Sequence, residues 1–453
     1  ITEKVDMKFF TIILTLALTV LQQGALAQDQ QTEKNKKTVT ESDRISKLED
    51  RLLELEAQNS LTKYRLSGLF INRYETLDWK HGLPGVDKTS EHINPMSMYF
   101  GLNVDFDVTK NLKFYSTFAM AKFYNNEDRN ESLDPNNPST GYATYQAAEM
   151  GSYAYGGSGV KVDRAYASYE YEGLPLTLAI GRMPTNNGPP LNQMDGQPRQ
   201  GTYPRFVFNA IFDGIAAVYD FSKYLPQDNT FKIRLFYQPF SFMDRSDRTH
   251  QFVDGDQLKS NVNQYAVLSE YSISNTPIAE RIDFMYMHAA WKDFYVGYGT
   301  APAPPGSPMA GQTEDGSDDG FYLGLENIAS TGLNFSWSAL LYKAVDSGLP
   351  DVSKKAWGHL FNINETFGEG WIIGYEFIKT EKYFFLYYWT RLNLMPFYSL
   401  QAAEGHHVYL GIPLSQKIMM RVGHYQITAG EGDVFQAEEL EGNSTYAQLR
   451  MNF

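Results

Sequence analysis

A two-residue period in hydrophobicity runs through most of this chain, and it restricts the possible fold more than any other feature. In residues 96–108, apolar side chains alternate with mostly polar ones. One set is Met98, Phe100, Leu102, Val104, Phe106 and Val108, and the other is Tyr99, Gly101, Asn103, Asp105 and Asp107. Because successive side chains of a β-strand point to opposite faces, this pattern predicts a strand between an apolar environment and water.

The same period recurs from Tyr64 to the last residue. It is present in residues 231–238 and in residues 371–377. At the end of the chain, one face carries Ala447, Leu449, Met451 and Phe453, and the other carries Tyr446, Gln448, Arg450 and Asn452. We therefore interpret the last residues as a strand, although chain ends usually fray. The chain is predicted to be all-β from residue 64 onward.

Short connections rich in turn residues alternate with long polar connections. The short ones are 107–111, 171–175, 329–332, 367–370 and 413–417. The long ones are 77–95, 125–159, 185–212, 241–261, 295–319, 344–355, 380–403 and 429–442. Tight turns at one end and long loops at the other are typical of transmembrane antiparallel β-barrels, so the pattern predicts about 16 strands, or about 18 if residues 383–399 hold two more. The acidic segment 313–320 is interpreted as a solvated external loop, since it lacks the spacing of an EF-hand.

The composition supports a membrane barrel. Aromatic residues make up 15% of the 453 residues, yet the mean hydropathy is only −0.39. This combination suits a sheet with one face in lipid, one in water and tyrosines at the borders. Because a sheet edge cannot remain unpaired in lipid, such a sheet must close on itself. The formal charge of −14 disfavours nucleic acid as a partner.

The residues before the barrel fall into three segments. Residues 1–27 are predicted to be a signal peptide cleaved after Ala27, with a misassigned start before Met7. Residues 28–44 are polar and are expected to be a disordered leader. Residues 45–62 are predicted to form a short periplasmic coiled coil, with a single amphipathic helix as the alternative. The seam of this coiled coil would be Ile45, Leu48, Leu52, Leu55 and Asn59. The barrel then occupies residues 63–453.

These features together resemble the outer-membrane porins of Gram-negative bacteria. Residues 162–182, "VDRAYASYEYEGLPLTLAIGR", resemble the Arg-Ala-Tyr strand, turn and Gly-Arg strand near the fourth and fifth strands of general porins. The final residues Leu449, Met451 and Phe453 resemble the assembly signal of outer-membrane barrels. The resemblance implies a homotrimer of passive channels in the outer membrane. Its implied partners are membrane lipid, lipopolysaccharide and the barrel assembly machinery.

The candidate pore residues follow from the parity of the strands. If the apolar faces point to lipid, these charged side chains point into the lumen: Lys113, Arg164, Glu170, Lys232, Arg234, Glu270, Asp283, Glu376, Arg421 and Arg450. Lys113, Arg164 and Arg450 are expected to form a basic patch that resembles the one in general porins, and the alternative is a lumen with randomly mixed charges screened by water.

The loop after the fifth strand folds inward in general porins. Segment 185–212 takes that position here, and its prolines lower the entropy cost of one fixed shape. Its constriction candidates are Asp195, Arg199 and Arg205, although the loop of the family is acidic.

The sequence does not predict an enzyme, a metal or a cofactor. It contains no HExxH, GxSxG or Gly-rich phosphate loop. His406 and His407 are neighbours, and neighbours on a strand point to opposite faces. Three functions stay open: a diffusion channel for small hydrophilic solutes and ions, a channel specific for anions or sugars, and a structural or partner-docking barrel with a plugged lumen.

Overall fold

The chain divides into two compact units, Ile1–Leu61 and Thr62–Phe453. The structure, a computed structural model, describes residues 47–49, 51, 64–94, 96–123, 160–184, 204, 206–207, 211–226, 228–238, 263–295, 313–346, 353–384, 400–430 and 439–453. In the first unit the described residues are helical, and Leu48 is exposed. The other seam positions of the predicted coiled coil lie outside the described residues: Ile45, Leu52, Leu55 and Asn59. So do the predicted signal peptide and leader.

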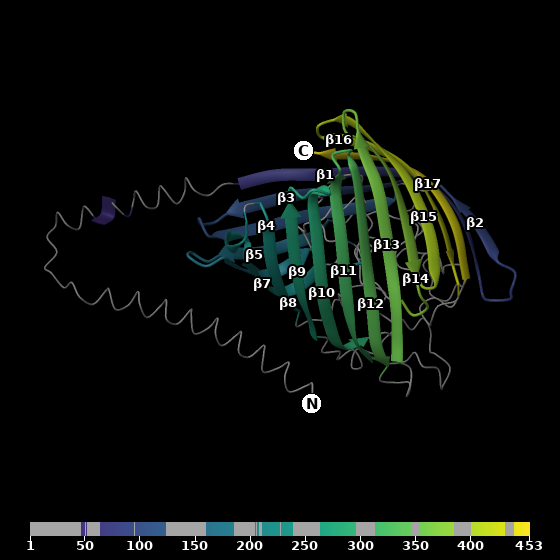
Figure 1. The fold of residues 1–453 in the computed structure, drawn as a ribbon, viewed down its shortest axis with the longest axis horizontal. Coiled ribbons are helices and arrows are strands. Elements are labelled where there is room, and N and C mark those ends of the chain that lie inside the picture. Colours follow the sequence, from purple (N-terminus) through teal and green to yellow (C-terminus); the bar gives the residue numbers. More distant parts are fainter. Residues whose placement is uncertain are drawn as a thin grey trace. The chain divides into compact units, whose positions relative to one another are not determined.

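The second unit is a closed antiparallel β-barrel (Figure 1). Its described strands are β1 (Tyr64–Gly82), β2 (Thr89–Ile93), β3 (Met96–Asp107), β4 (Leu112–Phe123), β5 (Lys161–Glu170), β6 (Leu176–Pro184), β7 (Ile211–Asp220), β8 (Thr230–Gln238), β9 (Asn263–Ser274), β10 (Ala279–Tyr295), β11 (Thr313–Ile328), β12 (Leu333–Asp346), β13 (Ser353–Phe367), β14 (Trp371–Thr380), β15 (Ala403–Ser415), β16 (Ile418–Ala429) and β17 (Glu439–Asn452). A 3₁₀ turn, η4 (Ser222–Tyr224), joins β7 to β8.

Sixteen of these seventeen strands form the wall. Strand β2 is the exception, because it is a short hairpin arm that pairs with the end of β1. From β3 to β17, each strand pairs with the next in sequence. The ring closes where β1 pairs with both β3 and β17. The prediction of an all-β barrel with about 16 strands is confirmed.

The alternative of 18 strands is wrong. Strands β14 and β15 pair directly, from Ile372 opposite Gly411 to Lys379 opposite Glu404. Residues 383–399 therefore cannot insert two more strands into the wall between them. Turns such as 329–332 and 368–370 mark one rim, called here the short-turn end. The opposite rim is called the long-loop end.

Several strands extend further toward the long-loop end than the sequence indicated. Strand β1 continues to Gly82, β12 continues to Asp346, and β17 begins at Glu439. The acidic segment 313–320 is the first half of β11, not a loop. Its charge is compatible with a strand because Asp319 receives a hydrogen bond from Lys343 on the neighbouring strand. Polar residues in these segments therefore belong to the ends of the strands near the long loops, and they do not mark the point where the strand stops.

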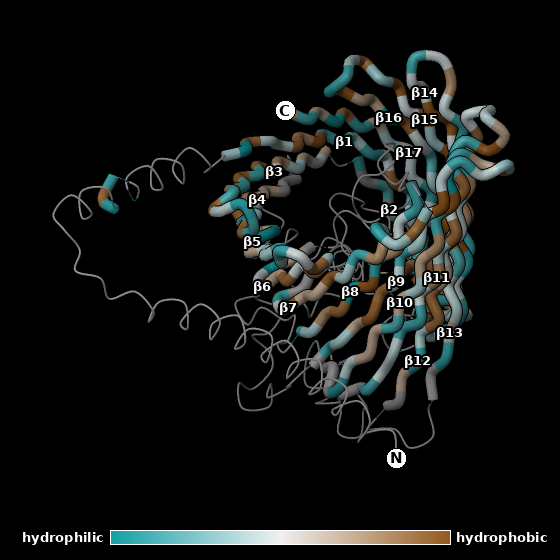
Figure 2. Tube along the Cα trace, turned by 60° about the vertical axis from the view of Figure 1, so that its left-hand side comes forward, coloured by the Kyte–Doolittle hydropathy of each residue, from teal (hydrophilic) through white to brown (hydrophobic). Residues whose placement is uncertain are grey.

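The outer face of the barrel is apolar and edged by aromatic side chains. Hydrophobic and hydrophilic residues alternate along the strands (Figure 2). On β13 and β14, Phe367 contacts Trp371 near the short-turn end, and Trp357 stacks on His359 towards the other end. Ten residues separate Phe367 from Trp357, which is about 33 Å along a strand and about 25 Å along the axis of a barrel tilted by about 40°. This height equals that of the apolar band of membrane barrels.

No helix among the residues that the structure describes is long and apolar enough to cross a membrane.

Candidate functional site: the inner wall of the barrel

The inner wall is built from every second residue of each strand. On β14, buried Ile372, Glu376 and Ile378 alternate with the exposed side chains of Trp371, Ile373 and Tyr375. The buried set points into the barrel, because side chains on the concave side of the wall are surrounded by those of other strands. His406 and His407 show the same rule, since His407 is buried on the inside and His406 bonds to Tyr375 on the outside. The site therefore consists of the inward residues of sixteen strands.

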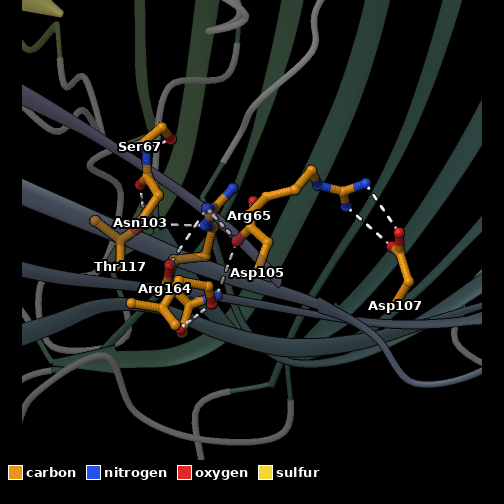
Figure 3. A network of polar contacts seen from close by, with 9 residues as sticks. Arg65, Ser67, Asn103, Asp105, Asp107, Thr117 and Arg164 are labelled. Atoms are coloured by element: carbon orange, nitrogen blue, oxygen red, sulfur yellow. Dashed lines mark hydrogen bonds and ion pairs between the residues drawn. The ribbon is translucent and has the colours of Figure 1, made fainter. Parts of the chain in front are cut away.

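The half of the inner wall near the short-turn end is polar and is called here the polar zone. Figure 3 shows part of it on β1, β3, β4 and β5. Arg164 donates to Asp105 (2.8 Å) and to the Thr117 hydroxyl (3.0 Å). Arg65 forms a bidentate pair with Asp107, at 3.0 and 3.1 Å. Bidentate pairs fix the geometry of both side chains.

Ion pairs continue around the polar zone. They are Lys113–Glu170 (2.6 Å), Lys232–Asp220 (3.5 Å), Arg234–Glu270 (2.5 Å) and Arg281–Asp283 (2.8 Å). With the two pairs in Figure 3, six cations face six carboxylates. This part of the wall is hydrophilic but has no net charge from these pairs. The basic patch expected at Lys113 and Arg164 is neutralised by neighbouring acids.

A second polar cluster is dry and lies on β1 and on β14 to β17. The His407 ring bonds to Glu376 through Nδ1 (2.6 Å) and to the Tyr446 hydroxyl through Nε2 (2.9 Å). The Arg421 guanidinium lies 4.1 Å from the centre of the Tyr409 ring, and Arg73 lies 3.8 Å from that of Tyr446. Cations over aromatic faces are attracted by the ring quadrupole. All of these side chains are buried.

Two glycines make this dry cluster possible. The Tyr409 ring lies flat over Gly374, and the Tyr446 ring lies over Gly423, at distances that leave no room for a Cβ. The tyrosines therefore pack against bare backbone of the neighbouring strand. This close approach leaves the other face of each ring to an arginine, Arg421 at Tyr409 and Arg73 at Tyr446.

The half of the inner wall near the long-loop end is apolar and is called here the apolar collar. Its members point inward and are buried: Leu77, Trp79, Leu268, Met285, Met287, Leu340, Leu360, Ile378, Ile427 and Leu440. They come from β1, β9, β10, β12, β13, β14, β16 and β17. An apolar surface of this kind is favourable only if protein, and not water, covers it.

Residues from two long connections pack against the collar. Phe206 and Val207 follow β6, and Phe384 follows β14; all three belong to the same buried cluster. The Phe206 and Phe384 rings are 5.3 Å apart. A Cβ at Gly320 would lie 2.9 Å from the Cα of Val207, so the glycine allows the connection to touch β11. Strand β11 is the fourth strand after β7 in the wall, so Val207 contacts a strand that is distant from β7 along the ring.

The predicted pore residues divide between these environments. Lys113, Arg164, Lys232 and Arg234 lie in the polar zone with acidic partners. Arg421 lies in the dry cluster, and Arg450 is buried on β17. Asp195, Arg199 and Arg205 lie outside the described residues.

The predicted assembly residues lie along the seam between β1 and β17. Met451 is opposite Phe70, and Leu449 is opposite Asn72. Phe453 exchanges two backbone hydrogen bonds with Gly68, at 2.8 and 3.0 Å. Its ring covers Gly68 and stacks on Phe100 of β3 at 5.9 Å. The last residue thus completes the closure at the short-turn end.

Sequence reasoning missed several residues of the wall. Arg73 and Glu75 form a buried pair at 3.0 Å on β1. Their spacing of two residues would have placed both on one face, had the strand boundaries been known. No pattern in the sequence indicated the collar, because the parity rule assumed that apolar side chains of the strands face lipid. Among the described residues, no cluster of acidic and histidine side chains could hold a metal ion.

Comparison with known proteins supports the architecture. OmpF of Salmonella typhi, in complex with daunomycin, superposes with a TM-score of 0.50 at 10% identity, over 87% of this chain and 99% of that one. OprB of Pseudomonas putida, at high pH, superposes with a TM-score of 0.51 at 12% identity, over 88% of this chain and 96% of that one. The fold is that of a porin barrel.

Sequence comparisons add little about activity. Residues 89–238 match a family described as a protein of unknown function (DUF3373). That segment runs from β2 to β8 and contains three of the six ion pairs of the polar zone completely. No curated protein matches the chain significantly.

Proposed function

We propose that this protein is an outer-membrane porin that forms a water-filled channel for passive diffusion of small hydrophilic solutes and ions. The closed barrel, the apolar outer face and the ion-paired polar zone support this proposal. Six cations neutralised by six carboxylates give a hydrated wall without a strong preference for one sign of charge. Dissolved ions screen such charges beyond about 8 Å at physiological ionic strength.

We infer that the channel is narrowest in the half with the apolar collar. The observation that carries this inference is the contact of Phe206 with Phe384, because it joins two connections inside the wall. The contact of Val207 with Gly320, four strands away from β7, supports an inward course of the first connection. Segment 185–212 would then set the conductance, and Arg199 and Arg205 would favour anions.

Single-channel recording of the purified protein in a planar bilayer tests the proposal. We expect open channels from the wild type and a higher conductance after deletion of residues 188–202. Arg199→Glu with Arg205→Glu should move the reversal potential toward cation selectivity, since charges in a narrow site are screened less than surface charges. The control is Lys80→Glu with Lys88→Glu, which makes the same charge change at exposed lysines. If neither the deletion nor the charge change alters the current, segment 185–212 lies outside the conducting path.

A plugged barrel that is structural or docks a partner is the second candidate. The apolar collar favours it, because buried Leu340 and Ile378 exclude water from part of the interior. In that case the wild type would carry no current, and the deletion would open it. The third candidate, a channel specific for anions or sugars, would use arginine and aromatic side chains as a track, but Arg73 and Arg421 are buried against their tyrosines.

The remaining proposals concern assembly. We propose that Phe453, Met451 and Leu449 direct insertion by the barrel assembly machinery, since they lie on the closing strand. We also propose a homotrimer, to which a periplasmic coiled coil over residues 45–62 contributes. About 27 Å of helix is too short to hold three chains alone, so barrel contacts would supply most of the affinity.

A further inference from the structure

A charged cluster lies on the outer face of β10 to β13, toward the long-loop end. It consists of His288, Asp319, Lys343 and Lys355, and is called here the outer basic cluster. These side chains share the outward face with Phe284, Tyr286 and Phe361, which are all exposed. Charged groups on the outer face of a membrane barrel are unfavourable unless they lie at an interface.

The acid in this cluster is already fully engaged. Asp319 Oδ2 receives a hydrogen bond from Lys343 at 2.6 Å. Its Oδ1 contacts His288 Nδ1 at 2.9 Å and receives a hydrogen bond from the Tyr286 hydroxyl at 3.0 Å. The side chains of Lys343 and His288 remain 44% and 40% exposed. Lys343 therefore keeps N–H donors available to a ligand approaching from outside the barrel, and the His288 ring borders that approach.

Two lysines face each other directly across the strand pair. Lys343 is opposite Lys355 in the register of β12 and β13. Like charges at directly opposed positions destabilise a sheet. Lys355 is exposed and makes no ion pair within the described part of the chain. Toward the loops, Lys292 and Asp315 are also exposed and add one charge of each sign. The cluster therefore carries an excess positive charge that an anion between the lysines would neutralise.

The height of the cluster identifies the kind of anion. Phe321 and Trp357 contact each other at 6.2 Å and form the outer aromatic belt with His359. Lys355 is two residues beyond Trp357, which is about 5 Å along the axis of a tilted strand. Aromatic belts of membrane proteins lie at the level of the lipid headgroups. The lysines therefore lie at or just outside that level.

We propose that the outer basic cluster binds the phosphate of a lipid headgroup, with Lys343 and Lys355 as the ligands. The aromatic faces of Trp357 and Phe321 would lie against the acyl chains of the same lipid. This proposal rests on the membrane location proposed above. It goes beyond that location by naming a lipid site and its residues. A free phosphate ion would gain the charges but not the aromatic surface.

Native mass spectrometry of the detergent-purified protein tests this site with added lipopolysaccharide. The variants are Lys355→Gln, which breaks no ion pair, and Lys343→Gln with Lys355→Gln. A lysine near an anionic lipid surface contributes roughly five-fold in affinity, so we expect about a five-fold loss of bound lipid for the single variant and about 25-fold for the double. The control is Lys110→Gln with Lys417→Gln, two exposed lysines at the short-turn end.

Equal lipid retention by the wild type and both variants would overturn the proposal. So would inorganic phosphate displacing the lipid, or binding equally well without it, since either result would identify a simple anion site. Channel recordings of the same variants separate this question from the proposed function. Open channels with unchanged lipid binding would reject only the lipid site, whereas the absence of channels in every variant and in the wild type would reject the diffusion channel.

Discussion

The polar zone and the apolar collar belong to one inner wall and share strands β1, β9 and β10, yet they differ in what covers them. In the polar zone, charged side chains pair across strands and stay partly open, as for Arg65 and Asp107. In the collar, apolar side chains such as Leu340 and Ile427 are buried under protein, including residues of the long connections. The parity of a strand therefore fixes which side chains point inward, but not whether they meet water.

The largest expected difference is between two ion pairs that begin on the same strand. The Arg73 and Glu75 side chains are 3% and 1% exposed, whereas those of Arg65 and Asp107 are 51% and 18% exposed. Glu75→Ala should destabilise the barrel by about 3–5 kcal/mol, because a buried guanidinium loses its carboxylate. Asp107→Ala should cost only about 0–1 kcal/mol, because water replaces the partner.

Guanidinium unfolding of the barrel in lipid vesicles, followed by the gel mobility of folded and unfolded protein, measures both values. Similar unfolding free energies for Glu75→Ala and Asp107→Ala would mean that water reaches the Arg73–Glu75 pair as easily as it reaches the Arg65–Asp107 pair.

A smaller effect is expected when the collar loses one aromatic side chain from a connection. The Phe384 ring lies over Gly358 of β13 with no room for a Cβ, and it is buried. Phe384→Ala should remove about 3 kcal/mol of packing, so the β14–β15 connection should open roughly 100-fold more often and be cleaved correspondingly faster by protease. The control is Phe367→Ala, an exposed outward ring at the short-turn end. If both variants resist protease as the wild type does, Phe384 does not hold the connection in place.

The smallest effect is expected at the seam, where an aromatic ring covers a glycine on the outside of the wall. Gly68→Ala would force the Phe453 ring away from its position, and overpacking of this kind costs about 1–3 kcal/mol. Gly411→Ala is the control, because its Cβ would meet nothing closer than 3.5 Å. The amount of folded barrel recovered after refolding measures the difference. Equal recovery of both variants would show that the Phe453 ring adds nothing to closure.

Much of the wall could be predicted from the sequence. The alternation in residues 96–108 gave the correct outward and inward faces of β3, and the same rule placed Lys113, Arg164 and Glu376 on the inward side. The spacing of turns gave the number of strands. These properties are local, because side-chain parity and turn residues depend on the chain within a few positions.

Other features depended on contacts between distant segments. The extension of β11 into residues 313–320 depends on its pairing with β10 and β12, which no local pattern encodes. The pairing of Arg164 with Asp105 joins residues 59 positions apart. The expected basic patch was missed for the same reason, because the acids that neutralise Lys113 and Arg164 lie on other strands.

The sequence by itself determined a closed sheet with one apolar face, because a two-residue period and alternating short and long connections allow few other folds. Only the tertiary structure decided which inward residues are wet. Phe206 and Phe384 are 178 positions apart in the sequence, yet their rings meet inside the barrel and help to cover the collar. Burial depends on everything that surrounds a side chain in space, whereas its direction depends only on the strand that carries it.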